Sequence, residues 1–226
     1  ASHTPLSAWP QRPFRTPHHS ASGPALVGGG SRPQPGEITL AHHGVLFLDE
    51  LPEFDRKVLE VLREPLESGQ IVIARARDKV RFPARFQLVA AMNPCPCGYL
   101  GDPEKSCSCT NLQILNYQKK LSGPLIDRID LTVNVARVPH EDLLKQKSLS
   151  DSQHKKYQFS ILKAIKMQNN RYLCSEKYNG SLTSKEIEQH IYLSSEVSNF
   201  ILAAAKKLDL SARSYFKVIK VARTIA

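Results

Sequence analysis

Hydrophobic and polar positions divide the chain into a part where strands alternate with helices and a part that is helical. The four apolar residues Val45–Leu48 precede two acids and predict a strand that is buried on both faces, as in a parallel sheet. Pro52 begins a helix, because apolar residues recur after it at helical intervals. Further core strands are predicted at residues 86–93 and 132–135. From residue 183 to residue 226 the apolar residues keep helical spacing, which predicts a small helical domain.

The same pattern divides the chain into three parts. Residues 1–139 hold the predicted strands and form an α/β domain. The beginning of this domain, residues 1–37, is rich in Pro, Gly, Ser and His and predicts a long ordered loop. Residues 140–182 are polar and Lys-rich, with apolar residues sufficient for helices but not for a core, so we expect a helical connector. Residues 183–226 form the helical domain.

A β-hairpin with a basic tip is predicted at residues 70–82, where apolar and basic residues alternate around a turn near Asp78. Arg75, Arg77 and Lys79 could grip the phosphates of a nucleic acid. Charge also protects exposed hairpins from aggregation. The pattern by itself favours neither interpretation.

Polar side chains follow the ends of the first two predicted strands. Asp49 and Glu50 end the first strand, and Asn93 ends the second. Ligands bind at this edge of parallel sheets, and an acid pair there suits a magnesium nucleotide, with one acid on Mg²⁺ and the other directing a water at the γ-phosphate. Alternatively, the acids cap the next helix and Asn93 is a turn residue before Pro94. The strand alone does not decide between these interpretations.

Two closely spaced cysteine pairs predict a metal site. In a chain expected to lie in a reducing compartment, four clustered cysteines favour a tetrahedral zinc site over free thiols. The gap of one residue within each pair is shorter than the usual two. All four ligands would come from the protein, so the predicted zinc is structural; they are Cys95, Cys97, Cys107 and Cys109.

Two pairs of adjacent histidines, His18 with His19 and His42 with His43, lack the helical spacing of a zinc site. Neighbouring side chains in such a pair diverge. Polar packing or contact with a substrate is therefore favoured over metal binding, and their role stays open.

Charge and the absence of long apolar runs restrict the class of protein. Lys and Arg number 31 against 21 Asp and Glu, a formal net charge of +10, which favours nucleic acid as a large partner. Basic residues also simply keep surfaces soluble. No run reaches the length of a membrane helix and no signal-peptide core is present, so a cytoplasmic location is the expectation.

Two arginines have both a local and a functional interpretation. Arg128 lies between Asp127 and Asp130, which suggests a local ion pair, or an arginine presented to a phosphate on another subunit. Arg213 falls in the first turn of the last predicted helix, where a cation opposes the helix dipole. A nearby anion would explain that position, although exposed arginines are common.

Taken together, these residues resemble the AAA+ ATPases of the magnesium-chelatase-like group, and within it the ComM (YifB) family. The resemblance covers almost the whole chain and depends on the order and spacing of several short segments. The most specific segments are residues 12–19, 35–42, 44–54, 82–86, 90–98, 122–131 and 221–226.

The resemblance implies an α/β fold: an incomplete AAA+ P-loop core, with a parallel sheet flanked by helices and a β-hairpin insert, followed by a small all-helical lid. One departure is large. The phosphate-binding loop G-x-x-x-x-G-K-[ST] is absent, because no Gly-Lys-Ser/Thr follows the three glycines at 28–30. The family carries this loop upstream, so we expect a C-terminal fragment that does not hydrolyse ATP alone.

The resemblance also implies roles for single residues. Asp49 and Glu50 match the Walker B acids, which handle Mg²⁺ and activate water. Asn93 matches sensor 1, Arg128 matches the arginine finger that acts on a neighbouring subunit, and Arg213 matches the sensor 2 arginine of the lid. The basic hairpin matches the pre-sensor 1 hairpin that lines the pore of related rings, which implies sequence-independent DNA contacts for Arg75, Arg77 and Lys79.

For the full-length protein the resemblance implies an ATP hydrolase of the bacterial cytoplasm, with ATP and Mg²⁺ as cofactors beside a structural Zn²⁺. It is expected to form a ring, taken as hexameric, and to drive branch migration of DNA during uptake and recombination. A second hypothesis is the motor subunit of a metal chelatase. A third is a zinc-stabilised nucleic-acid-binding module without enzymatic activity.

Overall fold

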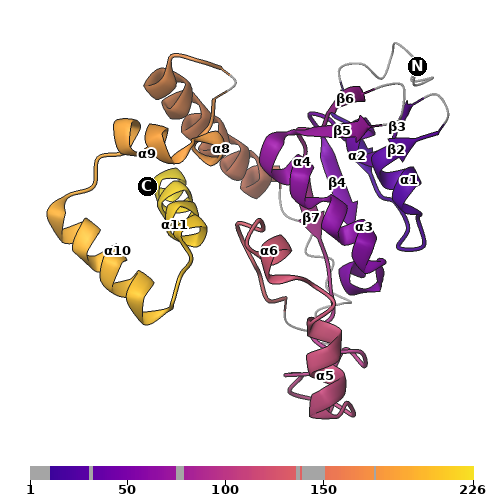
Figure 1. Cartoon of the computed structure of the whole chain (residues 1–226). Coiled ribbons are helices and arrows are strands. Elements are labelled where there is room, and N and C mark those ends of the chain that lie inside the picture. Colours follow the sequence, from indigo (N-terminus) through magenta and orange to yellow (C-terminus); the bar gives the residue numbers. More distant parts are fainter. Residues whose placement is uncertain (1–10, 31–32, 75–78, 136–137, 139–150, 176) are drawn as a thin grey trace. The chain divides into compact units, whose positions relative to one another are not determined.

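The computed structural model describes residues 11–30, 33–74, 79–135, 138, 151–175 and 177–226. The chain consists of two compact units, Ala1–Val133 and Asn134–Ala226. The first unit has a parallel sheet flanked by helices and the second is helical, as the sequence predicts (Figure 1). No helix in the described ranges is both long and apolar enough to cross a membrane.

A three-stranded parallel sheet forms the centre of the first unit. Its strand order is β1-β4-β7, and the strands are β1 (Phe14–Arg15), β4 (Val45–Leu48) and β7 (Gln87–Ala90). Along β4, Val45 aligns with Gln87 and Leu48 aligns with Ala90. The prediction that the first two core strands are parallel neighbours is therefore confirmed.

Strand β4 is buried on one face. Leu46 and Leu48 are fully buried, whereas Val45 and Phe47 alternate with them and are only partly covered. On this second face the ring of Phe47 stacks on Phe14 at 6.3 Å, and Phe14 stays 64% exposed. The prediction of a strand buried on both faces is wrong for the described residues, because the helices supply an apolar layer on only one side.

Short helices cover the buried face of the sheet, and two of them begin at a side-chain cap. Ser22 begins the first of them by accepting a hydrogen bond from the Ala25 amide, and Asp55 caps α3 by accepting one from the Lys57 amide. Gly69 ends α4 at φ 69°, the left-handed conformation that glycine adopts most easily. The helix expected from Pro52 onward is split into three elements. The elements are α1 (Gly23–Val27), α2 (Glu37–Leu40), η2 (Leu51–Glu53), α3 (Arg56–Val61) and α4 (Arg63–Ser68).

The predicted hairpin is present as β5 (Gln70–Ala74) and β6 (Lys79–Pro83), which pair in antiparallel fashion. Ile71 and Ile73 of β5 are buried in the core of the first unit. Arg75 and Arg77 lie outside the described residues, and Lys79 is exposed at the start of β6. A short ladder of β2 (Gly28–Gly29) and β3 (Gln34–Pro35) lies within the predicted N-terminal loop.

The third predicted core strand is absent from the described residues. After β7 the first unit continues with α5 (Asn111–Gln118) and α6 (Gly123–Ile126), and residues 131–135 are not in a strand. Their apolar side chains are exposed, with Leu131 at 68%, Val133 at 78% and Val135 at 88%. An alternating apolar segment becomes a strand only where a neighbouring strand accepts its backbone hydrogen bonds, and no described strand does so here.

The second unit consists of helices around a small core. Leu182, Ile187, Ile191 and Ile219 form its buried apolar cluster, and Thr183 begins α9 with a capping box to Glu186. The long helix α8, which the sequence analysis placed in a connector, adds Tyr172 to this cluster. The elements are α8 (Asp151–Tyr172), η3 (Asn179–Ser181), α9 (Ser184–His190), α10 (Ser195–Lys207) and α11 (Ala212–Ile225).

Candidate nucleotide and metal sites

The acids and the amide predicted from the strand ends emerge at one edge of the sheet. The Ala91 amide donates to the Leu48 carbonyl at 2.9 Å, and the Leu51 amide donates to the Ala91 carbonyl at 2.9 Å. These two bonds join the chain segments directly after β4 and β7. Asp49, Glu50 and Asn93 lie on those segments, and all three are exposed. This edge therefore offers carboxylate and amide oxygens to a ligand.

Glu50 has a backbone conformation that side chains other than glycine rarely adopt. Its φ of 50° and ψ of 46° lie in the left-handed region, at a cost of about 1–3 kcal/mol. The turn is held by the Glu50 amide, which donates to Asp49 Oδ1 at 2.9 Å, and by the Glu53 amide, which donates to the Glu50 carbonyl at 2.7 Å. Strained residues of this kind concentrate at functional sites.

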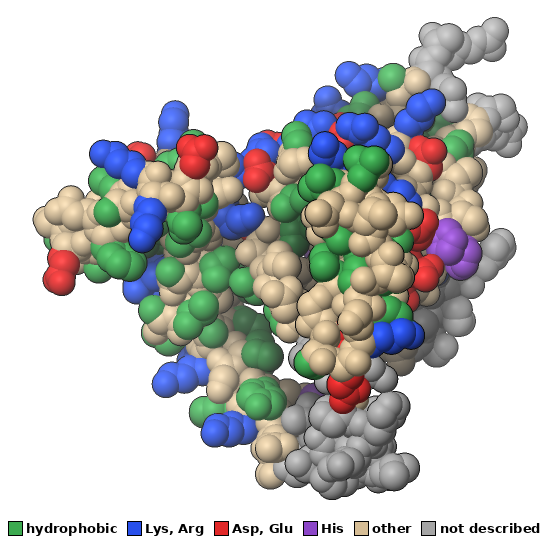
Figure 2. Space-filling model, turned by 90° about the horizontal axis from the view of Figure 1, so that it is seen from below, with side chains coloured by type: hydrophobic (Ala, Val, Ile, Leu, Met, Phe, Trp, Pro, Cys, Tyr) green, Lys and Arg blue, Asp and Glu red, His purple; other side chains and the backbone are tan. Residues whose placement is uncertain are grey.

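His19 contacts the same carboxylate. Its Nδ1 lies 3.1 Å from Glu50 Oε2, and its ring packs edge-on against Phe54 and beside His18. Figure 2 shows histidine and acidic side chains next to one another on the displayed face. The sequence leaves the role of His19 open, since a contact between residues 31 positions apart has no signature in local spacing.

The second histidine pair has a structural role. The Arg85 amide donates to His42 Nδ1 at 3.0 Å, and the His43 amide donates to the Arg85 carbonyl at 2.6 Å. Burial lowers the pKa of His42, and His43 and Arg85 lower it further. These contacts agree with polar packing, the interpretation that the sequence favours.

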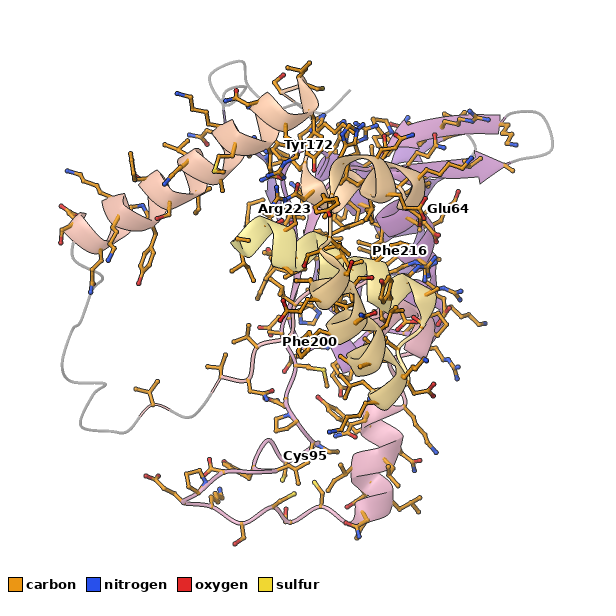
Figure 3. All side chains as sticks on the ribbon, turned by 90° about the vertical axis from the view of Figure 1, so that its left-hand side faces the viewer. Glu64, Cys95, Tyr172, Phe200, Phe216 and Arg223 are labelled. Carbon is orange, nitrogen blue, oxygen red and sulfur yellow. The ribbon has the colours of Figure 1, made fainter. Side chains whose placement is uncertain are left out.

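The four predicted cysteine ligands converge. Their sulfur atoms all lie within 4.8 Å of one another, and the distances from Cys95 to Cys97, Cys95 to Cys107 and Cys97 to Cys107 are 3.4, 3.6 and 3.5 Å. Figure 3 shows sulfur atoms gathered beside Cys95 in the loop that leads to α5. A tetrahedral zinc ion with Zn–S bonds of about 2.3 Å holds its sulfurs about 3.8 Å apart, so the thiols fit such an ion.

Within the group the pKa of Cys97 is lowered, whereas the pKa values of Cys107 and Cys109 are raised. A hydrogen bond with the backbone of Tyr99 is the main cause that lowers the pKa of Cys97 to about 5. The thiolate is the form that binds metals. Among the described residues, these cysteines are the only group of three or more potential metal ligands that lie close together.

Arg128 is directed into its own unit. Its side chain is 11% exposed, Nη1 donates to the Pro124 carbonyl at 2.6 Å, and Nη2 pairs with Glu67. Its Nε is buried without a hydrogen-bond partner in the described ranges. The ion pair with Glu67 joins Arg128 to a residue of α4.

Arg213 and Lys79 occupy exposed positions. Arg213 lies in the first turn of α11 in the second unit, and that turn holds no acidic residue. Lys79 lies at the start of β6 in the first unit. The structure therefore brings together Asp49, Glu50 and Asn93, and separately the four cysteines.

Comparison with known proteins identifies relatives along nearly the whole chain. A family model described as magnesium chelatase, subunit ChlI, matches residues 2–143, and a model of the C-terminal part of that subunit matches residues 151–226. The chain is 51% identical over 219 residues to "Competence protein ComM" of Haemophilus influenzae and 48% identical over 219 residues to "Uncharacterized protein YifB" of Escherichia coli. In both cases 96% of this chain is covered, and it spans 42% of the length of the relative.

A more distant similarity covers part of the chain. A "Magnesium-chelatase 38 kDa subunit" of Chlorobaculum parvum is 37% identical over 70 residues, which is 31% of this chain and 20% of that relative.

Proposed function

Since the chain belongs to the magnesium chelatase ChlI family, we propose that it is part of an ATPase motor that couples ATP hydrolysis to the remodelling of DNA. Its similarity to a competence protein favours branch migration during recombination of DNA taken up by the cell. The chain spans less than half of such relatives, so this activity is proposed for the full-length protein.

The proposal is carried by the placement of Asp49, Glu50 and Asn93 on adjoining chain segments at the carboxyl edge of a parallel sheet. The exposed carboxylate oxygens of Asp49 are hard donors of the type that Mg²⁺ prefers. Magnesium there would neutralise charge on the phosphates. Glu50 acts as the general base that accepts a proton from the attacking water, and Asn93 donates its amide N–H to a phosphate oxygen or to that water.

Arg128 and Arg213 would complete the site in an assembled ring, taken as a hexamer. As an arginine finger, Arg128 stabilises charge on the nucleotide of the neighbouring subunit. Its contacts with Glu67 and the Pro124 carbonyl mean that the guanidinium must first exchange these partners for phosphate. Arg213 contributes its cation from the helical unit.

The hairpin is proposed as the DNA contact. Lys79 is exposed at the start of β6, and the sequence pattern predicts a turn that holds Arg75 and Arg77, which lie outside the described residues. Cations on a protruding hairpin bind phosphates without reading bases, and such binding weakens as salt increases. Loss of these three charges is expected to reduce both the affinity for DNA and its salt dependence.

Structural zinc in the cysteine loop is the second part of the proposal. The zinc proposal rests on sulfur–sulfur distances of 3.4–3.6 Å between Cys95, Cys97 and Cys107. The chain purified without chelator should contain about one zinc ion. Cys97→Ser should lose that zinc, whereas Cys174→Ser, an exposed cysteine outside the group, should keep it. Substantially less than one equivalent in the wild-type chain would contradict the proposal.

The deciding experiment for the motor measures ATP hydrolysis and branch migration by the full-length protein with and without DNA. Loss of the general base in Glu50→Gln should reduce hydrolysis by at least about 100-fold while nucleotide binding persists. Glu64→Gln is the matched control, because Glu64 is an exposed glutamate of α4 away from this edge. Hydrolysis by Glu50→Gln at the wild-type rate would reject the assigned base.

The same experiment distinguishes the motor from two other functions. ATP hydrolysis without any effect of DNA would favour the motor of a metal chelatase, which the partial similarity to a magnesium-chelatase subunit suggests. DNA binding without ATP hydrolysis would favour a zinc-stabilised binding module, which the cysteine group suggests.

A further inference from the structure

The cysteine loop starts beside the proposed nucleotide site and ends at the beginning of α5. Cys95 follows Asn93 by two residues and is fully buried. After the last cysteine, Thr110 begins α5 with a capping box, in which its Oγ1 accepts from the Gln113 amide at 3.3 Å and its own amide donates to Gln113 Oε1 at 2.8 Å. The loop is therefore joined to a well-defined helix.

The end of α5 lies against the segment that carries Asn93. Gln118 Nε2 donates to the Pro94 carbonyl at 3.3 Å, and just beyond the helix Lys120 Nζ lies 3.2 Å from Glu53 Oε1. Tyr117 is 7% exposed. Burial and the charge of Glu53 raise the pKa of its phenol, and a hydrogen bond with the Asn93 backbone opposes this rise. The helix therefore contacts both segments of the proposed site.

Between β7 and α5 the described residues form neither helix nor strand. Backbone hydrogen bonds within residues 95–109 join near neighbours, as in the Gly98 amide, which donates to the Cys95 carbonyl at 3.0 Å. The two cysteine pairs lie at opposite ends of the loop. A metal bound by all four would cross-link its ends, and so hold α5 in place behind Asn93.

We propose that zinc in the cysteine loop is a brace for Asn93, acting through Tyr117 and Gln118, so that metal occupancy controls the geometry of the nucleotide site. The consequence for catalysis rests on the proposed ATPase function, whereas the mechanical link does not. Tyr117, buried at the end of α5 beside Gln118, is accordingly a positioning residue.

The mechanical link is tested by nuclear magnetic resonance on the ¹⁵N-labelled chain, loaded with zinc and then treated with a chelator. Removal of zinc should shift the backbone amides of Asn93, Asp49 and Glu50 together with those of the loop. Changes confined to residues 95–110 would overturn the proposal. A chain that holds no zinc when purified and takes up none when zinc is added would overturn it as well.

The catalytic consequence is tested with Tyr117→Phe in the full-length protein, a change that leaves all four cysteines in place. It should keep its zinc, and kcat should fall about tenfold with KM for ATP unchanged. Tyr99→Phe, the same change within the loop, should behave as wild type. If Tyr117→Phe hydrolyses ATP normally, the brace is rejected. If the wild-type protein hydrolyses no ATP, the motor proposal fails and the resonance experiment still decides the link.

Discussion

The two units of the chain differ in where their polar side chains lie. In the first unit an apolar core lies beneath the sheet, and the acids and amide at the strand ends stay exposed. In the second unit the apolar core is small, and Asn179, which is 1% exposed, is the most buried polar residue among those described and bonds to residues of α8 and α11. The amide of Asn179 thus serves its own fold, whereas the acids and the amide at the strand ends of the first unit are exposed to a ligand.

The largest effect is expected from a cavity beneath the sheet. Leu46→Ala removes a fully buried side chain of β4, and should lower the free energy of unfolding of the first unit by about 2–5 kcal/mol. Hydrogen exchange of single amides measures each unit separately. Amides of β4 and β7 should lose protection, whereas those of α9 and α11 should keep theirs.

The matched control for that cavity is Val89→Ala. Val89 lies on the neighbouring strand β7 and is 42% exposed, so the change should cost less than about 1 kcal/mol. Equal losses for Leu46→Ala and Val89→Ala would show that the core beneath the sheet does not hold the first unit together.

An intermediate effect is expected at the amide network of the second unit. Asn179 Oδ1 accepts from Arg171 Nη1 at 3.0 Å and from the Tyr172 hydroxyl at 2.5 Å, and its Nδ2 donates to Thr224 Oγ1 at 2.9 Å. Asn179→Ala removes these three bonds from partly buried groups, and should lower the stability of this unit by about 1–3 kcal/mol. Chemical denaturation followed at amides of α9 and α11 would measure the loss.

Asn169→Ala is the control for Asn179→Ala in the second unit. The Oδ1 of Asn169 is buried and has no hydrogen-bond partner among the described residues, and alanine is the better helix former. The change should therefore leave the stability of the second unit unchanged or slightly higher. A loss as large as that of Asn179→Ala would mean that the hydrogen-bond network is not what matters.

The sequence predicted those features that depend on local pattern or on matched short segments. The apolar run before Asp49 and Glu50 placed a strand, and its parallel neighbour placed Asn93 at the same edge. The spacing of four cysteines predicted the group of thiols now found within 4.8 Å. These features follow from residues whose order along the chain already constrains their position.

The features that the sequence did not predict depend on contacts between distant residues. The pairing of Arg128 with Glu67 joins residues 61 positions apart, and the contact of His19 with Glu50 has no local signature. The segment 132–135 has the pattern of a strand but no partner among the described strands. The apolar pattern favours an extended backbone, but a strand forms only where a neighbouring strand completes its backbone hydrogen bonds.

The smallest effect, and the one that tests the second unit by pH, concerns Glu186. Its Oε1 lies 2.6 Å from Lys177 Nζ, and its Oε2 accepts from the Thr183 amide at 2.8 Å. The bond with Lys177 is the main cause that lowers the pKa of Glu186 to about 2. Because the folded pKa lies below the unfolded value of about 4.5, this contribution is present above pH 4.5 and is lost as pH falls towards 2.

Unfolding of the second unit measured between pH 5 and pH 2 should therefore show less loss of stability in Glu186→Gln than in the wild type. Lys177→Met should fall between them, since the bonds from Thr183 to the carboxylate remain. The side chains of this pair are about 30% exposed, so solvent weakens their attraction. Identical pH profiles for all three proteins would mean that the Glu186 carboxylate does not contribute to the pH dependence of this unit.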